Sequence, residues 1–142
     1  MGVTSRVQAT AERFAKALDA DDFTCAEEFL APDCEYHIDG RLLVGTGQII
    51  NSYRNNSEWG QSVLDAVEFG SRVESVADNE VVISFTDRIK KGDLSHVFQC
   101  RQLLTIDERR ELITRIQHQD VGGEREALQA FFDRCGITRR ER

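Results

Sequence analysis

The first third of the chain places apolar residues at helical spacing. One side of a first helix carries Val7, Ala11, Phe14, Ala15 and Leu18. Thr4 or Ser5 is the candidate cap, because a hydroxyl side chain satisfies the first free amide groups of a helix. A second, short helix follows the acidic residues 19–22 and ends at Pro32; its apolar side is formed by Phe23, Ala26, Phe29 and Leu30. A third helix begins at Thr46 and fades between 55 and 59.

From residue 67 onward apolar positions alternate with polar ones, which is the spacing of strands. Tight turns at 77–80, 90–93 and 107–110 divide this region into four long strands. Two of the strands have a clear inward face, formed by Val81, Ile83, Phe85 and Ile89 on one and by His96, Phe98, Cys100, Gln102, Leu104 and Ile106 on the next. A pair of glycines ends the last strand, and a final amphipathic helix follows, which Gly136 closes.

This order of elements predicts a fold of the α+β class. Three helices and a short strand come first, and four long strands and a closing helix complete a mostly antiparallel sheet. With 142 residues the chain is expected to form a single domain over 1–142, with 139–142 as a frayed tail. A long, strongly curved sheet around helices leaves a hollow at one end, and that hollow is the expected ligand site.

The composition narrows the possible partners. Hydrophobic residues make up 40% and charged residues 30%, which is the balance of a globular protein. A net charge of −7 would repel a phosphate backbone, so we expect no nucleic-acid partner. No apolar run approaches ~18 residues, so no membrane span is expected. The N-terminus lacks the apolar stretch of a secretory signal, and we expect a cytoplasmic location.

The four cysteines do not indicate a chemistry of their own. Cys25, Cys34, Cys100 and Cys135 form no C-x-x-C pair, so the ligand spacing of a zinc knuckle and the dithiol of a thioredoxin-type motif are both missing. We expect thiols that pack as small apolar residues. We expect neither a metal site nor an organic cofactor.

The segment 34–40, CEYHIDG, concentrates polar side chains just before a glycine turn. Side chains on a strand alternate between its faces, so Tyr36 and Ile38 point one way while His37 and Asp39 point the other. The apolar half normally points inward, which favours Tyr36 inside and His37 outside. The opposite orientation would place His37 and Asp39 at the hollow as an acid–base pair. Asp39 ends the strand, where a turn can redirect its side chain, so it is a candidate in either case.

Two further histidines lie on long strands. His96 shares the inward face of its strand, and His118 shares the parity of two apolar residues on the last strand. Histidine titrates near neutral pH and is the usual general acid or base. The candidate catalytic residues are Tyr36, Asp39, His96, Gln102 and His118. Their convergence would support proton transfer on a carbonyl compound, as in isomerisation or dehydration. The alternative is that each histidine is a hydrogen-bonded structural or surface residue.

Four stretches carry a resemblance to a known superfamily: RFAKALDADDF (13–23), FLAPDCEY (29–36), LVGTGQIINSY (43–53) and IDERRELITRIQHQD (106–120). They resemble the first helix with its acidic corner, the entry to the first strand, the third helix and the last hairpin of the nuclear transport factor 2-like superfamily. Within this superfamily, they resemble the SnoaL-like and ketosteroid isomerase-like proteins. The resemblance implies a cone-shaped curved sheet wrapped around three N-terminal helices, with an additional C-terminal helix. Members include isomerases, dehydratases, polyketide cyclases, epoxide hydrolases and binding modules, so the fold implies a small-molecule pocket but no single reaction.

The ketosteroid isomerase pattern is matched only in part. The tyrosine of that family falls at Phe14, which has no hydroxyl, and its protonated aspartate falls at Gln102, whose amide can still donate a hydrogen bond. Its base falls at Ile38 or, with a shift of one residue, at Asp39. Steroid isomerase activity is therefore not expected.

Other side chains are expected to bind the ligand: Phe14, Tyr53, Trp59, Phe85, Phe98 and Gln117. The resemblance implies that Gln117 points into the cavity, against the parity of His118, and a bulge in that strand would reconcile the two. Residues 124–126 are interpreted as the solvated face of the last helix.

Two hypotheses follow. The leading one is an isomerase- or lyase-like enzyme that acts on a small, largely apolar carbonyl or hydroxylated compound without a cofactor. The alternative is a non-catalytic ligand-binding or dimer-assembly module. The outer face of the sheet, with Val97, Leu103 and Val82, is more apolar than solvent exposure prefers. The resemblance implies a homodimer through that face.

Overall fold

The computed structural model describes residues 5–138. Within them the helices are α1 (Arg6–Asp19), α2 (Phe23–Glu27), α3 (Thr46–Val63) and α4 (Glu124–Cys135). The strands are β1 (Leu30–Ile38), β2 (Arg41–Val44), β3 (Ala66–Ala77), β4 (Glu80–Lys91), β5 (Leu94–Asp107) and β6 (Leu112–Asp120). The α+β class and the three tight turns that join the long strands are confirmed. The predicted tail at 139–142 lies outside the described residues.

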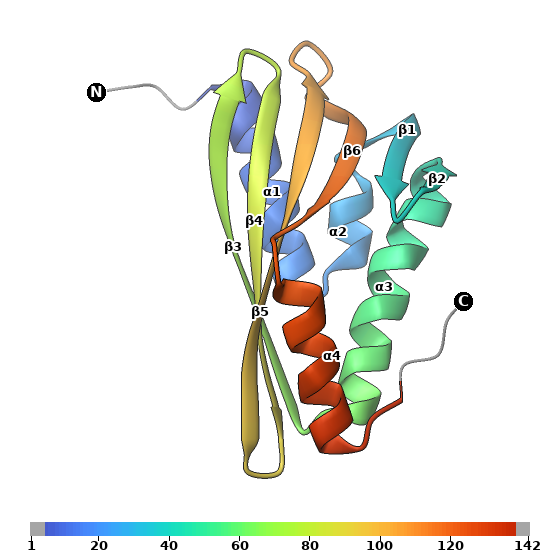
Figure 1. Cartoon of the computed structure of the whole chain (residues 1–142). Coiled ribbons are helices and arrows are strands. Elements are labelled where there is room, and N and C mark those ends of the chain that lie inside the picture. The colour runs from blue at the N-terminus through green and yellow to red at the C-terminus, as the bar shows by residue number, and fades with distance from the viewer. Residues whose placement is uncertain (1–4, 139–142) are drawn as a thin grey trace.

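The strands form one curved, open sheet in the order β2-β1-β6-β5-β4-β3 (Figure 1). Only β1 and β6 pair in parallel, and all other neighbours are antiparallel. Helices α1, α2 and α3 lie on one side of the sheet, and α4 packs beside β5 near its far end (Figure 1). The predicted curved, mostly antiparallel sheet with helices on one side is therefore confirmed.

The start of α1 follows from its sequence. Ser5 caps the helix, because its Oγ accepts a hydrogen bond of 3.0 Å from the amide of Gln8. The predicted apolar side is buried against the sheet, and Ala11 and Phe14 have no exposed surface at all. Burying a large apolar side chain contributes about 1.5–3 kcal/mol, so this side of α1 fixes the helix on the sheet.

The region around Pro32 differs from the prediction. The second helix ends at Glu27, and the chain then enters β1 at Leu30. Pro32 is tolerated in this strand because the pairing of β1 with β6 shifts register between Leu30 and Glu35, where no regular ladder bond is lost. Two further elements differ from the prediction. The strand β2 was not predicted, and α3 is longer than predicted, since it continues to Val63.

The turn between β1 and β2 consists of two residues, Asp39 and Gly40. Their φ angles are +52° and +73°, and the flanking residues Ile38 and Arg41 pair directly. An Asp-Gly pair suits such a turn, because both positions need the left-handed region that matches the twist of the strands. This turn sets the direction of the Asp39 side chain.

The β5–β6 pairing contains a bulge. Thr105 pairs with Arg115 but Ile106 pairs with Ile113, so Thr114 is the extra residue. The bulge changes the parity of β6, and it allows Ile113, Ile116 and His118 all to point inward. A bulge, which would have reconciled the two parities, is present in this strand, but it leaves Gln117 on the outer, exposed face. The expectation that Gln117 points into the cavity is wrong.

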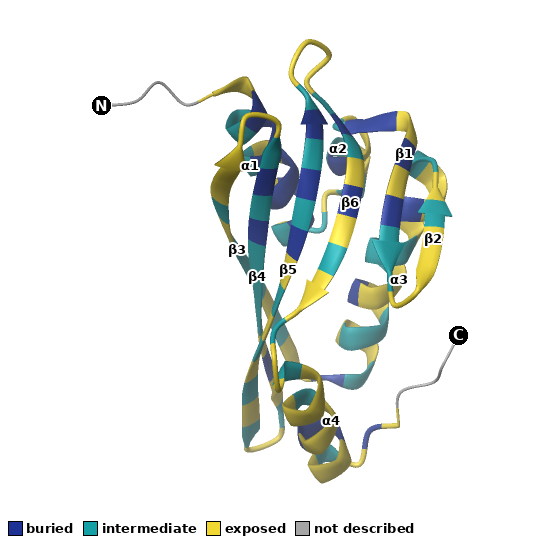
Figure 2. Cartoon of the chain, turned by 45° about the horizontal axis from the view of Figure 1, so that its top comes forward, coloured by how far each residue is buried: buried dark blue, intermediate teal, exposed yellow. Residues whose placement is uncertain are grey.

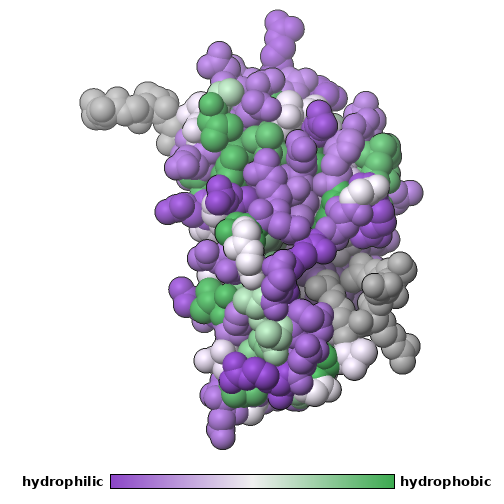
Figure 3. All heavy atoms as spheres, in the orientation of Figure 1, coloured by the Kyte–Doolittle hydropathy of each residue, from purple (hydrophilic) through white to green (hydrophobic). Residues whose placement is uncertain are grey.

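Two hydrophobic clusters hold the fold together. The larger one lies between α1–α3 and the sheet, and it includes Phe14, Tyr36 and Leu104. Figure 2 shows the buried positions on these elements in dark blue. The smaller one lies under α4 and includes Phe131 and Phe132. Between the two clusters the inner face of the sheet is not covered by apolar packing, and a cavity lies there. The surface seen in Figure 3 is mostly hydrophilic, with its hydrophobic residues in separate groups.

Candidate functional site

A cavity of about 1090 Å³ lies between the inner face of the sheet and the helices. Its aromatic lining consists of Phe23, Tyr36, Tyr53, Phe69, Phe85, Phe98 and Phe132. Its charged or titratable lining consists of Asp19, Asp21, Asp39, Arg41, Asp87, Cys100, His118, Asp120, Arg125, Glu126 and Asp133. A large, partly apolar cavity with a few convergent polar groups is the usual form of a small-molecule site.

The strand register brings two cross-strand pairs together on the inner face. Gln102 of β5 lies directly opposite His118 of β6. One row further along, Cys100 lies opposite Asp120. The side chains of cross-strand partners are neighbours on the same face, so a sequence separation of 16 residues becomes direct contact.

Gln102 is the centre of a buried hydrogen-bond network, and only 3% of its surface is exposed. Its Nε2 donates to the Tyr36 hydroxyl at 2.8 Å, and its Oε1 accepts from the Tyr53 hydroxyl at 2.5 Å. The two tyrosine rings stack, with centroids 5.4 Å apart. Burial raises the pKa of Tyr36 and of Tyr53 well above the usual value, so both hydroxyls stay protonated and can donate. The predicted inward orientation of Tyr36 is confirmed.

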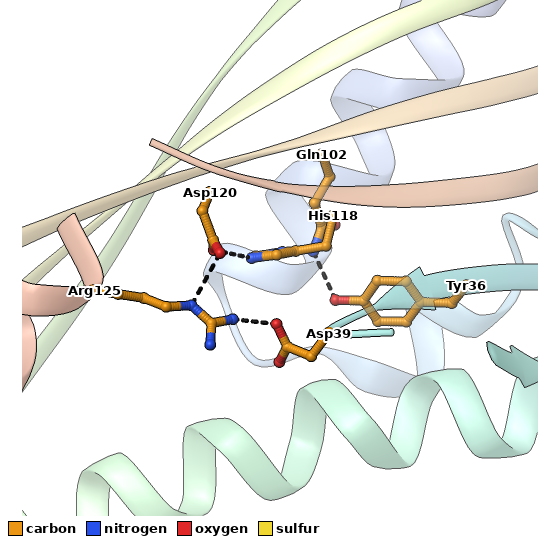
Figure 4. Close-up of polar contacts among 6 residues, drawn as sticks. All are labelled: Tyr36, Asp39, Gln102, His118, Asp120 and Arg125. Atoms are coloured by element: carbon orange, nitrogen blue, oxygen red, sulfur yellow. Dashed lines mark hydrogen bonds and ion pairs between the residues drawn. The ribbon is translucent and has the colours of Figure 1, made fainter. Parts of the chain in front are cut away.

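A second chain of contacts starts at the same amide (Figure 4). His118 Nδ1 lies 3.5 Å from Gln102 Nε2, and His118 Nε2 lies 3.0 Å from Asp120 Oδ1. Arg125 Nε then contacts Asp120 Oδ2 at 3.0 Å, and Arg125 Nη2 donates to Asp39. Segments from β5, β6, α4 and the β1–β2 turn are thus joined in one polar row.

The contacts of His118 define the tautomer that fits best. Asp120 accepts hydrogen bonds only, so Nε2 carries the proton and donates it to the carboxylate. Nδ1 is then unprotonated and faces the amide N–H of Gln102 and the cavity. The imidazole side chain is only 12% exposed. Such a histidine can accept a proton at Nδ1, and Asp120 would stabilise the charge that forms.

Asp39 lines the cavity, as expected for a residue at a strand end. It forms an ion pair with Arg125 instead of presenting a free carboxylate. Asp39 therefore holds Arg125 in place, and Arg125 in turn holds Asp120. His37 lies on the other face of β1 and pairs with Glu35 at 3.2 Å.

His96 does not join this group. It stacks on Phe131 with ring centroids 5.3 Å apart, and its Nε2 is buried without a hydrogen-bond partner among the described residues. Six residues along β5 separate it from Gln102, a distance of about 20 Å. The expectation that His96 and Gln102 converge is wrong, because sharing a strand face does not make distant positions neighbours.

Two expected ligand residues are also core residues. Phe14 is fully buried and packs edge-on against Tyr53, with centroids 6.0 Å apart. Trp59 packs edge-on against Phe132 in the smaller cluster, at 5.4 Å. Neither lines the cavity, whereas Tyr53, Phe85 and Phe98 do.

The sequence reasoning missed Asp120 and Arg125. Asp120 follows His118 at a spacing of two, which puts both side chains on the same face of a strand, and this spacing is the signal that identifies it. Arg125 was assigned to the solvated face of the last helix, but it makes two ion pairs. Its neighbour Glu124 also has a partner, since it accepts a hydrogen bond from the amide of Gln99.

A third missed residue is Asp87, on the opposite wall of the cavity. It lies in phase with Ile83 and Phe85 on the inward face of β4, so a carboxylate interrupts an otherwise apolar row. Burial raises its pKa to about 6, and the nearby charge of Asp19 contributes. The pKa of Asp19 is raised by burial as well, against the hydrogen bond that it accepts from Ser71 at 2.6 Å.

Two other classes of site find no support in the part of the chain that the structure describes. No three His, Cys, Asp or Glu side chains among residues 5–138 are placed to hold a metal ion. The cysteines are free thiols, and burial raises the pKa of Cys34 and Cys100 to about 12. None of the described helices is long and apolar enough to span a membrane.

Comparison with known proteins identifies the fold. No protein-family model and no curated protein matches the sequence. Among solved structures, a SnoaL-like protein of the polyketide cyclase class from Shewanella putrefaciens superposes with a TM-score of 0.69 at 15% identity, covering 93% of this chain and 99% of its own. TerC, co-crystallised with polyporic acid, gives 0.69 at 14% identity, covering 91% and 99%.

An LEH-like epoxide hydrolase from M. tuberculosis gives 0.63 at 19% identity, covering 90% and 92%. The chain has the fold of the nuclear transport factor 2-like superfamily, and the resemblance seen in the sequence is confirmed at that level. Since one fold can host several reactions, the activity has to be argued from the site.

Proposed function

We propose that this protein is a cofactor-independent enzyme of the isomerase or lyase type, which moves a proton on a small carbonyl or hydroxylated compound. One observation carries the proposal: the Nε2 atom of Gln102 contacts both the Tyr36 hydroxyl and Nδ1 of His118. A proton donor and a proton acceptor therefore lie side by side at the same wall of the cavity.

In this proposal Tyr36 binds the carbonyl oxygen. Its hydroxyl oxygen accepts from Gln102, so its own proton is available to a substrate oxygen. Tyr53 donates to the other end of the Gln102 amide, which polarises the amide and strengthens the Tyr36 donor. A donor held this way stabilises the negative charge that develops on the oxygen in the transition state.

His118 is the general base. Nδ1 takes the proton from the carbon next to the carbonyl, and the electron pair of the broken C–H bond moves onto the oxygen held by Tyr36. The imidazolium formed is stabilised by Asp120, which Arg125 holds in place. The same proton then returns to another carbon, which is an isomerisation, or to a departing hydroxyl group, which leaves as water.

Proton exchange provides the test. We expect the wild type to accelerate deuterium incorporation next to the carbonyl of small ketones such as cyclohexanone and phenylacetone in D₂O, followed by NMR. His118→Gln is expected to lower the rate by roughly 10²–10⁴-fold.

His37→Gln is the matched control, because His37 also pairs with a carboxylate two residues away but lies on the other face of β1. An equal loss in both variants would count against the proposal. Binding of the ketones without any exchange would favour the alternative, a ligand-binding module.

We further infer a homodimer through the outer face of the sheet. Val97 supports this, since 42% of its surface is exposed on that face. Val97→Lys is expected to lower the molar mass measured by light scattering to that of the monomer, and an unchanged mass would contradict the dimer. A single domain over 1–142 and a cytoplasmic location remain predictions.

A further inference from the structure

Asp87 occupies an unusual position within the cavity. Its direct partners across the strands are Phe69 on β3 and Phe98 on β5, and Phe85 precedes it on the same face. All four line the cavity. Within residues 5–138 the carboxylate of Asp87 makes no hydrogen bond and no ion pair, so it faces an aromatic surrounding without a partner.

The other charges of the cavity do not neutralise Asp87. The lining contains seven acidic side chains but only two arginines. Arg125 already contacts two carboxylates, those of Asp39 and Asp120. The neighbour on α1 is Asp19, whose Oδ1 is buried without a hydrogen-bond partner. This wall of the cavity thus favours a positive charge and disfavours an anion.

The partial burial of Asp87 independently supports a cationic partner. Removal from water raises the pKa of Asp87 to about 6, so near neutral pH the group is mostly an ionised carboxylate in an apolar surrounding. A buried charge of this kind is compensated best by a charge of opposite sign in direct contact. Aromatic faces around it also attract a cation.

We propose that the substrate of this site carries a protonated amine, which Asp87 binds as counter-ion among Phe69, Phe85 and Phe98. The proposal takes the cavity of the proposed function as its premise and adds the class of substrate. Asp87 lies four residues along β4 from Ile83, the partner of Gln102, so the amine site lies about 13 Å along the sheet from the Gln102 row. The substrate would be an amine-bearing carbonyl or hydroxylated compound long enough to reach both.

The test compares two probes of nearly equal shape. Phenethylamine is a cation at neutral pH, whereas 2-phenylethanol is neutral. Their dissociation constants are measured by NMR titration, with the backbone amides of 69, 87 and 98 as reporters. We expect the wild type to bind the amine at least roughly tenfold more tightly, and Asp87→Asn to remove this preference. The preference is also expected to shrink at about pH 5, where Asp87 takes up a proton.

Asp78→Asn is the control, because it removes the same charge from the exposed turn between β3 and β4, outside the cavity. Equal or weaker binding of the amine to the wild type, or a preference that survives in Asp87→Asn, would overturn the proposal. Thermal melting shows whether the variant is folded. Ketone exchange is a separate readout: amine preference without exchange refutes the proposed reaction alone, and exchange without amine preference refutes the substrate class alone.

Discussion

Gln102 and Tyr36 are 66 residues apart in the sequence and are joined by a hydrogen bond of 2.8 Å from the amide Nε2 to the hydroxyl. Because that amide also meets His118, the bond fixes the position of the proton donor relative to the proton acceptor. The geometry of the site depends on this one amide.

Tyr36→Phe tests the donor. Without the hydroxyl the oxyanion loses its hydrogen bond, and we expect ketone exchange to fall roughly a hundredfold. The amide of Gln102 also loses an acceptor, so the free energy of unfolding should fall by about 1 kcal/mol in urea titrations. Tyr53→Phe should have a smaller effect on the rate, since Tyr53 acts through Gln102. A rate unchanged by Tyr36→Phe would exclude Tyr36 as the donor.

Arg125→Ala tests the positioning of Asp120. The three side chains of the ion pairs are between 40% and 51% exposed, so the loss in stability should stay below about 1 kcal/mol. Exchange should nevertheless fall roughly tenfold, because Asp120 and with it His118 lose their fixed orientation. Arg134→Ala, on the exposed last turn of α4, is the control and should leave the rate unchanged. Equal rates of ketone exchange in both variants would show that Arg125 does not position Asp120.

Asp87→Asn tests the cost of the partly buried carboxylate. The folded-state pKa of about 6 lies above the unfolded value near 4, so the folded state binds more protons between these two pH values. The free energy of unfolding therefore falls as pH rises through this window and stays low above it. The variant should be more stable at pH 7 by about 1–3 kcal/mol and should lose this pH dependence, as measured by urea titration from pH 4 to 7. A less stable variant at pH 7 would contradict this account.

His96→Phe tests the position of His96 in the core. Phenylalanine keeps the stack on Phe131 and removes the nitrogen that has no partner, so we expect a gain of about 1 kcal/mol in the free energy of unfolding. His96→Ala removes the stack and should destabilise the protein instead. Ketone exchange is expected to be unchanged in His96→Phe, and its loss would restore His96 as a catalytic candidate.

The fold was predictable because local patterns agree with the final arrangement. The helical spacing of α1, the alternation of β4 and β5 and the tight turns each act over a few residues, and the structure keeps them all. The errors arose where tertiary pairing decides. Phe29 and Leu30 fit a helix locally, but the pairing of Leu30 with Ile113 makes this segment a strand.

The site was predictable only in part, for the same reason. Tyr36, Gln102 and His118 follow from inward parity, which a strand encodes directly. His96 has the same parity as Gln102, and only its position along the strand excludes it. Arg125 carries no local signal, because its partners Asp39 and Asp120 come from two other elements.

The bulge at Thr114 decides which side chains of β6 line the cavity. If Thr114 took a regular place in the ladder and the chain before it kept its pairing, the alternation after it would invert, and Arg115, Gln117 and Gln119 would point inward. The imidazole would then be outside and an amide would take its place, although neither side chain had been mutated. A shift of one residue in the pairing of β6 is therefore enough to convert one kind of pocket into another.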